Sequence, residues 1–299
     1  MPDGKQRYFC NHCRISFSWS TGRIKYQREF EWFERWVIEG YSVRQLAKQS
    51  GLSPATIRRI IHYWLTRPPK DQLCPGGRES VFLVCDGTYL HHRHGMFAAF
   101  DAHSHRLVYA AYGITEGPTG MVEFCRRLVA FGVSPKAAII DGNRHLFRAL
   151  RLAWPDIIIQ RCLVHIQRQG LSWCRNNPKR VDARKLREIY QQVLSVSNHE
   201  QKEQFLNAVQ RWNEHYGTQF TERGPVHGWV ATDLNRARSM LLRAIPYMFH
   251  YLDNKDIPIS TNIAEGYFSR LKKHYRLHQG LAPHQRENYF RWYFHLCQL

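Results

Sequence analysis

Five short apolar segments follow one another within residues 81–162 of the 299-residue chain. Each has the length of a β-strand. Amphipathic stretches at residues 120–131 and 146–152 flank the fourth segment, and their apolar spacing predicts helices. The order strand, strand, strand, helix, strand, helix, strand predicts an α/β fold with a mixed five-stranded sheet that begins as an antiparallel meander. The strand segments are residues 81–85, 96–100, 107–112, 137–140 and 157–162.

An aspartate followed by a glycine closes the first and the fourth strand segments. The first and fourth strands lie side by side in this order of elements, so we expect Asp86 and Asp141 to meet at one end of the sheet. Two carboxylates about 4 Å apart repel each other unless cations bridge them. The pair therefore indicates a divalent-metal site, and two metals suit in-line phosphoryl transfer. The alternative for each residue alone is the turn role that Asp-Gly often has.

The charge of the chain points to a polyanionic partner. There are 43 Lys and Arg against 24 Asp and Glu, a formal net charge of +19, and the excess is spread along the whole sequence. Nucleic acid is the usual partner of such a charge, and a solvated basic surface is the alternative. A hydrophobic content of 43% excludes global disorder, and no segment has the roughly 18 apolar residues of a membrane helix. Eight cysteines are too few for a disulfide scaffold, so we expect a cytoplasmic, nucleoid-associated protein.

Residues 43–60 predict two helices joined by a tight turn. Gly51 permits the positive φ that such a turn needs, and Ser53 and Pro54 suit the start of the second helix. This pattern is typical of a helix-turn-helix, whose second helix enters the major groove of DNA. The alternative is a helical hairpin used only for packing. The candidate DNA-binding residues are Ser53, Thr56, Arg58, Arg59 and His62.

Cys10 and Cys13 form a CxxC pair in an aromatic setting near the start of the sequence. Two thiols at this spacing can bind one Zn²⁺, but a structural zinc site needs four ligands, and the sequence has no second CxxC pair. The segment is similar to the second half of a zinc ribbon. The alternative is a pair of thiols without a metal.

The region from residue 162 to residue 255 has the apolar spacing of several helices. Another helix is predicted around Glu265, which lies seven residues before Lys272, two turns away on one face. A Glu that reaches a metal, with a Lys two turns along, suits an anionic substrate. The alternative is a solvated Glu on a basic helix.

A final helix is predicted over residues 283–297, and it is rich in aromatic residues. These residues indicate a core segment or a contact between protomers, with base stacking as the alternative.

The series Asp86, Asp141, Glu265 resembles that of the DDE transposases, and its details resemble the Mutator-like transposases of bacterial insertion sequences. The Cys-x-x-His pair after the second aspartate is a signature of that group, and the long interval before Glu265 matches its all-helical insertion. The resemblance covers residues 80–299. The motifs that carry it are Asp86-Gly-Thr, Asp141-Gly-Asn, Cys162-Leu-Val-His165 and Thr261-Asn-Ile-Ala-Glu265-Gly.

The resemblance implies an RNase H-like core in which Asp86, Asp141 and Glu265 are catalytic and bind two Mg²⁺ ions, with Mn²⁺ as a substitute. It implies DNA partners, namely the element ends and the target, and a homo-oligomer of at least two chains, because two ends are joined. A thiol is a poor ligand for Mg²⁺, and as zinc ligands the Cys-x-x-His pair would need two further partners, so we expect an architectural or hydrogen-bonding role near the site. The residues expected to support the site are Cys162, His165, Asn262 and Lys272.

These inferences together predict a transposase that cleaves and transfers DNA strands at the ends of an insertion sequence. The alternatives are a catalytically inactive DNA-binding regulator and a structure-selective nuclease on the same fold. The expected domains are a partial zinc-ribbon-like segment (1–22), a helix-turn-helix domain (23–66), a linker (67–79), the first part of the RNase H-like core (80–176), a helical insertion (177–256) and the last helices of the core (257–299).

Overall fold

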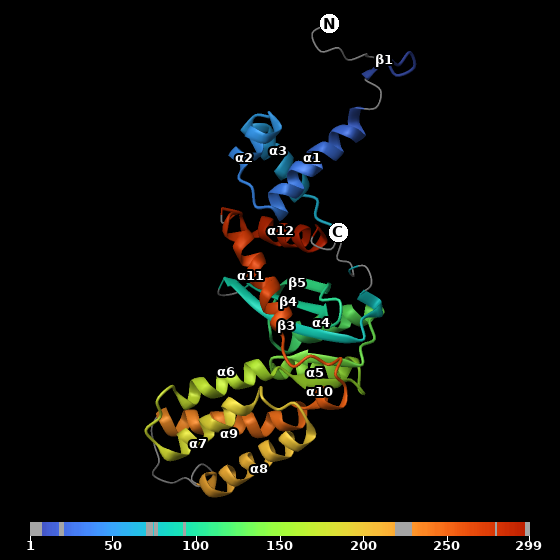
Figure 1. The fold of residues 1–299 in the computed structure, drawn as a ribbon. Helices are drawn as coiled ribbons and strands as arrows, with labels where there is room; N and C mark the ends of the chain where they lie inside the picture. Colours follow the sequence, from blue (N-terminus) through green and yellow to red (C-terminus); the bar gives the residue numbers. More distant parts are fainter. Residues whose placement is uncertain are drawn as a thin grey trace. The chain divides into compact units, whose positions relative to one another are not determined.

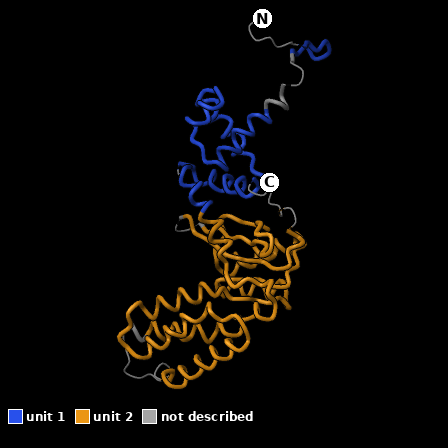
Figure 2. Tube along the Cα trace, in the orientation of Figure 1, with its two compact units in different colours: residues 1–71, 270–299 blue, residues 72–269 orange. Residues whose placement is uncertain are grey.

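The computed structural model describes residues 8–17, 21–69, 74, 77–91, 94–218, 229–278 and 280–296. The chain forms two compact units (Figure 2). The larger unit comprises residues 72–269, and the smaller unit comprises residues 1–71 and 270–299. None of the helices in the described ranges combines the length and the apolar character that a membrane span requires.

A mixed five-stranded sheet organises the larger unit (Figure 1). The strand order is β5-β4-β3-β6-β7, in which β3, β4 and β5 form an antiparallel meander and β6 and β7 run parallel to β3. The predicted α/β class and the adjacency of the first and fourth strands are confirmed. The strands are β3 (Phe82–His91), β4 (His94–Asp101), β5 (Leu107–Ile114), β6 (Ala137–Ile140) and β7 (Ile158–Arg161).

The strand that carries Asp86 is longer than the sequence suggested. We expected it to end at the carboxylate, but β3 continues to His91. The parallel pairing with β6 does end just before Asp86, at the pair Cys85 and Ile140. The antiparallel pairing with the longer β4 continues, and Asp86 pairs with Ala98. Asp86 therefore lies within β3, at the level where its parallel neighbour ends.

One face of the sheet is covered by α4 (Pro118–Ala130) and α5 (Arg144–Ala153), as the apolar spacing predicted. Leu83 and Cys85 of β3 belong to this core. Because successive side chains of a strand point to opposite faces, Asp86 faces the other side. That side is covered by α11 (Asn262–Arg276), whose Tyr267 and Phe268 rings contact Phe100 of β4.

The region after β7 is helical, as predicted, and has a hydrophobic core of its own. Tyr190 and Phe205 are among its fully buried side chains, and the Tyr190 hydroxyl donates a hydrogen bond of 2.7 Å to the Ala237 carbonyl. Among the described residues of the larger unit, Gly77–Glu79 and Ile245–Tyr247 form 3₁₀ turns. The helices are α6 (Leu163–Cys174), α7 (Val181–Gln192), α8 (His199–Tyr216), α9 (Trp229–Ala244) and α10 (His250–Asp253).

The smaller unit has an aromatic core. Phe33 and Trp64 both contact Trp292 of the last helix, whose indole N–H donates to the Trp64 carbonyl at 2.9 Å. The aromatic residues of that helix are buried, so their interpretation as core is confirmed. The elements are the hairpin strands β1 (Tyr8–Phe9) and β2 (Ser16–Phe17), and the helices α1 (Thr21–Ile38), α2 (Val43–Ser50), α3 (Pro54–Leu65) and α12 (Pro283–Leu296).

Capping residues define the ends of α2 and α3. Ser42 and Gln45 form a capping box at the start of α2, and Gly51 ends that helix with φ of 70°. Ser53 then caps α3 by accepting a hydrogen bond from the Thr56 amide at 3.1 Å. A left-handed residue between two capped helices gives a short turn, as the sequence predicted.

Candidate active site

Asp86 lies on the central strand β3 and is buried, with 8% of its surface exposed. Its Oδ1 accepts a hydrogen bond from the Gly87 amide at 2.8 Å. Burial raises the pKa of Asp86 to about 6, and the negative charge of Asp141 adds to this effect, although the Gly87 hydrogen bond and His165 oppose it. Asp86 is thus a carboxylate whose charge costs free energy unless a cation compensates it.

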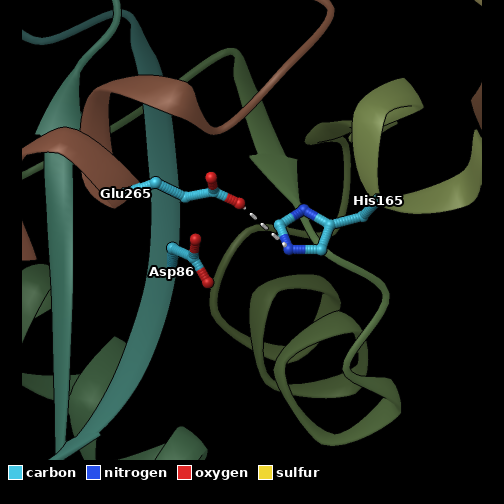
Figure 3. Close-up of side chains that lie close together, drawn as sticks. All are labelled: Asp86, His165 and Glu265. Carbon is cyan, nitrogen blue, oxygen red and sulfur yellow. Dashed lines mark ion pairs between the residues drawn. The ribbon is translucent and has the colours of Figure 1, made fainter. Parts of the chain in front are cut away.

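Glu265 and His165 reach the same space as Asp86 from two helices. Glu265 lies in the first turn of α11 and His165 in the first turn of α6. One ligand atom from each of the three residues lies within 4.8 Å of the others. Figure 3 shows the three side chains pointing toward one another, with the His165 Nε2 atom 3.5 Å from the Glu265 Oε1 atom.

Glu265 is also held by Arg168, which lies one turn after His165 on α6. The Arg168 guanidinium donates to the same Glu265 oxygen at 3.1 Å. Two side chains of α6 therefore fix the orientation of the Glu265 carboxylate.

A buried thiol fixes the His165 ring. The Cys162 Sγ atom lies 3.2 Å from the His165 Nδ1 atom and accepts hydrogen bonds from the amide and hydroxyl of Thr261. Burial alone would raise the pKa of the Cys162 thiol, but the hydrogen bonds from His165 and Thr261 lower it overall. The hydrogen bond to Cys162 raises the pKa of His165. The hydrogen bond between the two side chains thus contributes to both pKa shifts.

Asp141 lies on the neighbouring strand end and is not part of the group within 4.8 Å. It follows β6 directly, and its Oδ1 accepts a hydrogen bond from the Asn143 amide at 2.9 Å. Its carbonyl accepts from Arg161 at 3.1 Å, and Gly142 has φ of 116° with no room for a side chain beside that guanidinium. The structure thus brings Asp86 and Glu265 together, and it places Asp141 on the strand end beside Asp86.

The other residues expected at the site differ in position. Asn262 is the first residue of α11 and is exposed. Lys272 lies on the same helix, but on the part that belongs to the smaller unit.

The expected zinc ligands Cys10 and Cys13 lie in the loop between β1 and β2. Hydrogen bonds with Cys13 lower the pKa of the Cys10 thiol. Within the described ranges, neither cysteine belongs to a group of three metal-ligating residues.

The expected DNA-binding residues lie at the start and on the outer face of α3. Arg58, Arg59 and His62 are exposed, while the Thr56 hydroxyl is 3.0 Å from the Ser53 hydroxyl at the helix cap. The buried face of α3 is formed by residues such as Ile57 and Ile60, and the two arginines lie outside it.

The sequence reasoning missed Glu116 and Arg168. Glu116 lies between β5 and α4, where its Oε2 accepts a hydrogen bond from the Asn143 side-chain amide at 3.2 Å. Burial and the charge of Asp141 raise the pKa of Glu116. A signal was present, because Glu116 follows a strand and precedes a glycine, like Asp86 and Asp141. Arg168 gave no comparable signal among so many basic residues.

Carboxylate oxygens are the ligands that Mg²⁺ and Mn²⁺ prefer. Asp86 and Glu265 supply such oxygens within reach of one cation, and Asp141 supplies another at the adjacent strand end. The His165 ring is engaged by Cys162 through Nδ1, so only its Nε2 atom faces the carboxylates. The donor set fits a hard divalent cation.

Comparison with known proteins identifies the family. The family model described as "Transposase, Mutator family" matches residues 101–285, which is more than half of the chain. The matched range includes Asp141, Cys162, His165 and Glu265, and it begins after Asp86. A search of curated proteins gave no match. The family match covers the helical region and the strands β5, β6 and β7, and the chain therefore belongs to the Mutator family of transposases.

Proposed function

We propose that this transposase cleaves DNA at the ends of an insertion sequence and transfers the freed strands to a target, using an RNase H-like core. Asp86, Asp141 and Glu265 are the catalytic carboxylates of this proposal. The observation that carries it is the convergence of Asp86 and Glu265, far apart in the sequence, within 4.8 Å of each other's ligand atoms. The sheet order, with the Asp86 strand beside the Asp141 strand, supports it.

The proposed cofactor is a pair of Mg²⁺ ions, which Mn²⁺ can replace. Asp86 would contact both ions, and Asp141 and Glu265 would complete the ligand shells. When bound, two such ions supply activation of the attacking hydroxyl and stabilisation of the leaving oxygen. The raised pKa of Asp86 and its proximity to Asp141 support a site that needs compensating positive charge. A zinc ion at Cys10 and Cys13 remains a separate proposal.

The other residues of the site act on the carboxylates and on the substrate. Cys162 orients the His165 ring, and Arg168 and His165 hold the Glu265 carboxylate in place. Arg168 is more than half exposed, so its guanidinium has donors left for a phosphate of the DNA strand. The chain thereby combines fixed carboxylates with positive charge beside them, as a phosphodiester substrate requires.

DNA binding is assigned to the helix-turn-helix formed by α2 and α3. The exposed Arg58, Arg59 and His62 support this role, and so does the net charge of +19. We keep the functional division expected from the sequence, with the core at residues 80–176 and 257–299 and the helical insertion at residues 177–256, although residues 270–299 pack in the same compact unit as α1, α2 and α3. Joining two element ends requires at least two chains on the DNA.

A strand-transfer assay tests the proposal. The substrate is a labelled duplex that carries the inverted repeat flanking the gene, with Mg²⁺ and a supercoiled target. We expect the wild-type chain to cleave the duplex and join it to the target. Asp86→Asn should abolish both steps and leave binding of the duplex intact, because the removed carboxylate and the DNA-binding helix α3 belong to different compact units of the chain.

The outcomes separate the alternatives. Binding without cleavage by the wild type would indicate a regulator. Cleavage without joining, and without a need for the repeat, would indicate a structure-selective nuclease. Full activity of the Asp86→Asn variant would refute the catalytic assignment.

A further inference from the structure

Glu116 connects the two strand ends that carry the aspartates. It follows β5, is half-buried, and precedes Gly117 at the start of α4. Both its backbone carbonyl and its Oε2 atom accept hydrogen bonds from the Asn143 side-chain amide, at 3.3 and 3.2 Å. The residue is thus tied to the segment that follows β6.

Asn143 also contacts Asp141. The Asn143 backbone amide donates to the Asp141 carboxylate at 2.9 Å. Its side-chain oxygen accepts from the amides of His145 and Leu146 at 2.8 and 3.2 Å and so caps α5. Because the oxygen is used by the cap, the NH₂ group is left for Glu116. The side chain of Asn143 is therefore fixed at both ends.

The other oxygen of Glu116 lies beside the residue after Asp86. A Cβ atom at position 87 would lie 2.5 Å from the Glu116 Oε1 atom and 2.8 Å from the Phe97 ring. Real Cβ atoms do not approach other atoms so closely, so the space that Gly87 leaves open is occupied by Glu116. Glu116 therefore lies beside Gly87, which follows Asp86, and accepts hydrogen bonds from Asn143, which follows the Asp141-Gly142 pair.

We propose that Glu116 is a positioning residue, which fixes the Asp141 turn relative to Asp86 by holding Asn143. This inference rests on the proposed function, because Asp141 matters only if it binds a cation. Ligands that bind a metal need placement within about 0.5 Å, and groups that orient them change metal affinity about 10- to 100-fold. In this structure such an orienting group is a carboxylate that none of the catalytic motifs contains.

Two substitutions at position 116 distinguish the effect of the hydrogen bond from that of the negative charge. A glutamine at position 116 can still accept the Asn143 hydrogen bond through its side-chain oxygen, but it has no charge. An alanine can do neither. If Glu116 acts by holding Asn143, glutamine restores function and alanine does not.

Two measurements on the full-length chain test this. The first is hydrogen exchange of the backbone amides of residues 141–146, with and without Mn²⁺. The second is the Mn²⁺ concentration that gives half-maximal cleavage of the inverted-repeat duplex. For Glu116→Ala we expect faster exchange in this segment and about a tenfold higher Mn²⁺ requirement. Glu116→Gln should behave like the wild type in both.

Glu123→Ala is the matched control, because Glu123 is on α4 and forms exposed ion pairs with Arg126 and Arg127 of the same helix. It should change neither measurement. Asn143→Ser keeps an oxygen for the helix cap and loses the donor to Glu116. It should reproduce the Glu116→Ala defect, and the double variant should be no worse than either single variant.

Three outcomes would contradict the positioning role of Glu116 or the proposed function. Unchanged exchange and Mn²⁺ requirement in Glu116→Ala would overturn the proposal. A Glu116→Gln variant as impaired as Glu116→Ala would also overturn it, because charge rather than the hydrogen bond would then be required. If the wild type neither binds Mn²⁺ nor cleaves, the proposed function fails, while the exchange rates still show whether Glu116 fixes the turn.

Discussion

Asp86 and Asp141 each follow directly the last register pair that joins β3 to β6, Cys85 with Ile140. The two aspartates therefore stand at the same level of adjacent parallel strands. Their surroundings differ, because Asp86 shares its space with His165 and Glu265, while Asp141 is held by Asn143 and Arg161.

This difference predicts unequal roles in cation binding. Removing a carboxylate charge about 4 Å from a divalent cation costs several kcal/mol at a protein surface. Asp86 would contact both ions, so Asp86→Asn should weaken Mn²⁺ binding to the site more than Asp141→Asn does. Calorimetric titration of each variant with Mn²⁺ in the presence of end DNA measures this. Equal losses for the two variants would contradict the central position of Asp86.

The second prediction concerns the thiol that holds His165. In Cys162→Ala the His165 ring and the buried Thr261 amide and hydroxyl lose a shared acceptor. We expect cleavage to fall about 10- to 100-fold, because a group that orients the site is lost. Cys162→Ser should retain part of the activity, since serine keeps a smaller acceptor. DNA binding measured in parallel should not change.

Cys125→Ala is the control for the loss of a buried thiol. Cys125 lies in the core between α4 and the sheet and has no contact with the site carboxylates in the described hydrogen-bond network. It should lower stability without a specific loss of cleavage. If both alanine variants lose activity equally, Cys162 has no orienting role.

The sheet and its order followed from the sequence, because short apolar segments and amphipathic spacing are local properties. The strand lengths did not follow. β3 runs beyond Asp86 because β4 offers partners there, whereas the Asp86-Gly87 pair interrupts the apolar segment and indicates a turn. The aromatic spacing of α12 predicted burial, but it contained no information that the partners are Phe33 and Trp64 of the N-terminal helices.

The site residues likewise divide into those that the sequence identifies and those whose contacts depend on the fold. Asp86, Asp141 and Glu265 stood out because acids beside strand ends and in a recognisable motif are visible in sequence. The contact of His165 and Arg168 with Glu265 joins α6 to α11 across about a hundred residues. It depends on how α11 packs on the sheet, and no periodicity encodes that. Glu116 was missed because an acid in a loop is usually solvated.

The third prediction tests the DNA-binding role of α3. Arg58 and Arg59 are exposed on this helix. Replacing both by alanine should weaken DNA binding and reduce the slope of log K against log salt by up to about 0.9 for each lost phosphate contact. Fluorescence anisotropy at several salt concentrations measures the slope. Arg126→Ala, an exposed arginine on α4, is the control; an equal effect in it would indicate binding by general charge alone.

The fourth prediction concerns packing in the helical region. A Cβ atom at Gly170 of α6 would lie 2.1 Å from the buried Tyr190 ring. Alanine gains about 1 kcal/mol of helix propensity over glycine, but overpacking a core costs about 1–3 kcal/mol. Because Tyr190 is fully buried and hydrogen-bonded to Ala237, the ring cannot move aside cheaply. We therefore expect Gly170→Ala to lower the free energy of unfolding in urea, and the exposed Ser172→Ala on the same helix not to.

The last prediction is a pH dependence of stability in the smaller unit. His278 is buried, with 7% of its surface exposed, and its Nε2 atom lies 2.9 Å from the Trp36 carbonyl. Burial lowers the pKa of His278 from 6.5 to about 4; the Trp36 hydrogen bond opposes the shift and His274 adds to it. The unfolded chain thus binds a proton near pH 6.5, and the folded chain does so only near pH 4.

The folded state therefore loses stability as the pH falls through this window. The pKa difference corresponds to about 3 kcal/mol over the full range. In His278→Gln, which keeps a side-chain N–H for Trp36, the free energy of unfolding should fall less between pH 7 and pH 4.5. Urea unfolding at each pH measures this, with the exposed His62→Gln of α3 as the control. Parallel stability curves for the wild type and His278→Gln would contradict the prediction, because the proton uptake would then belong to other groups.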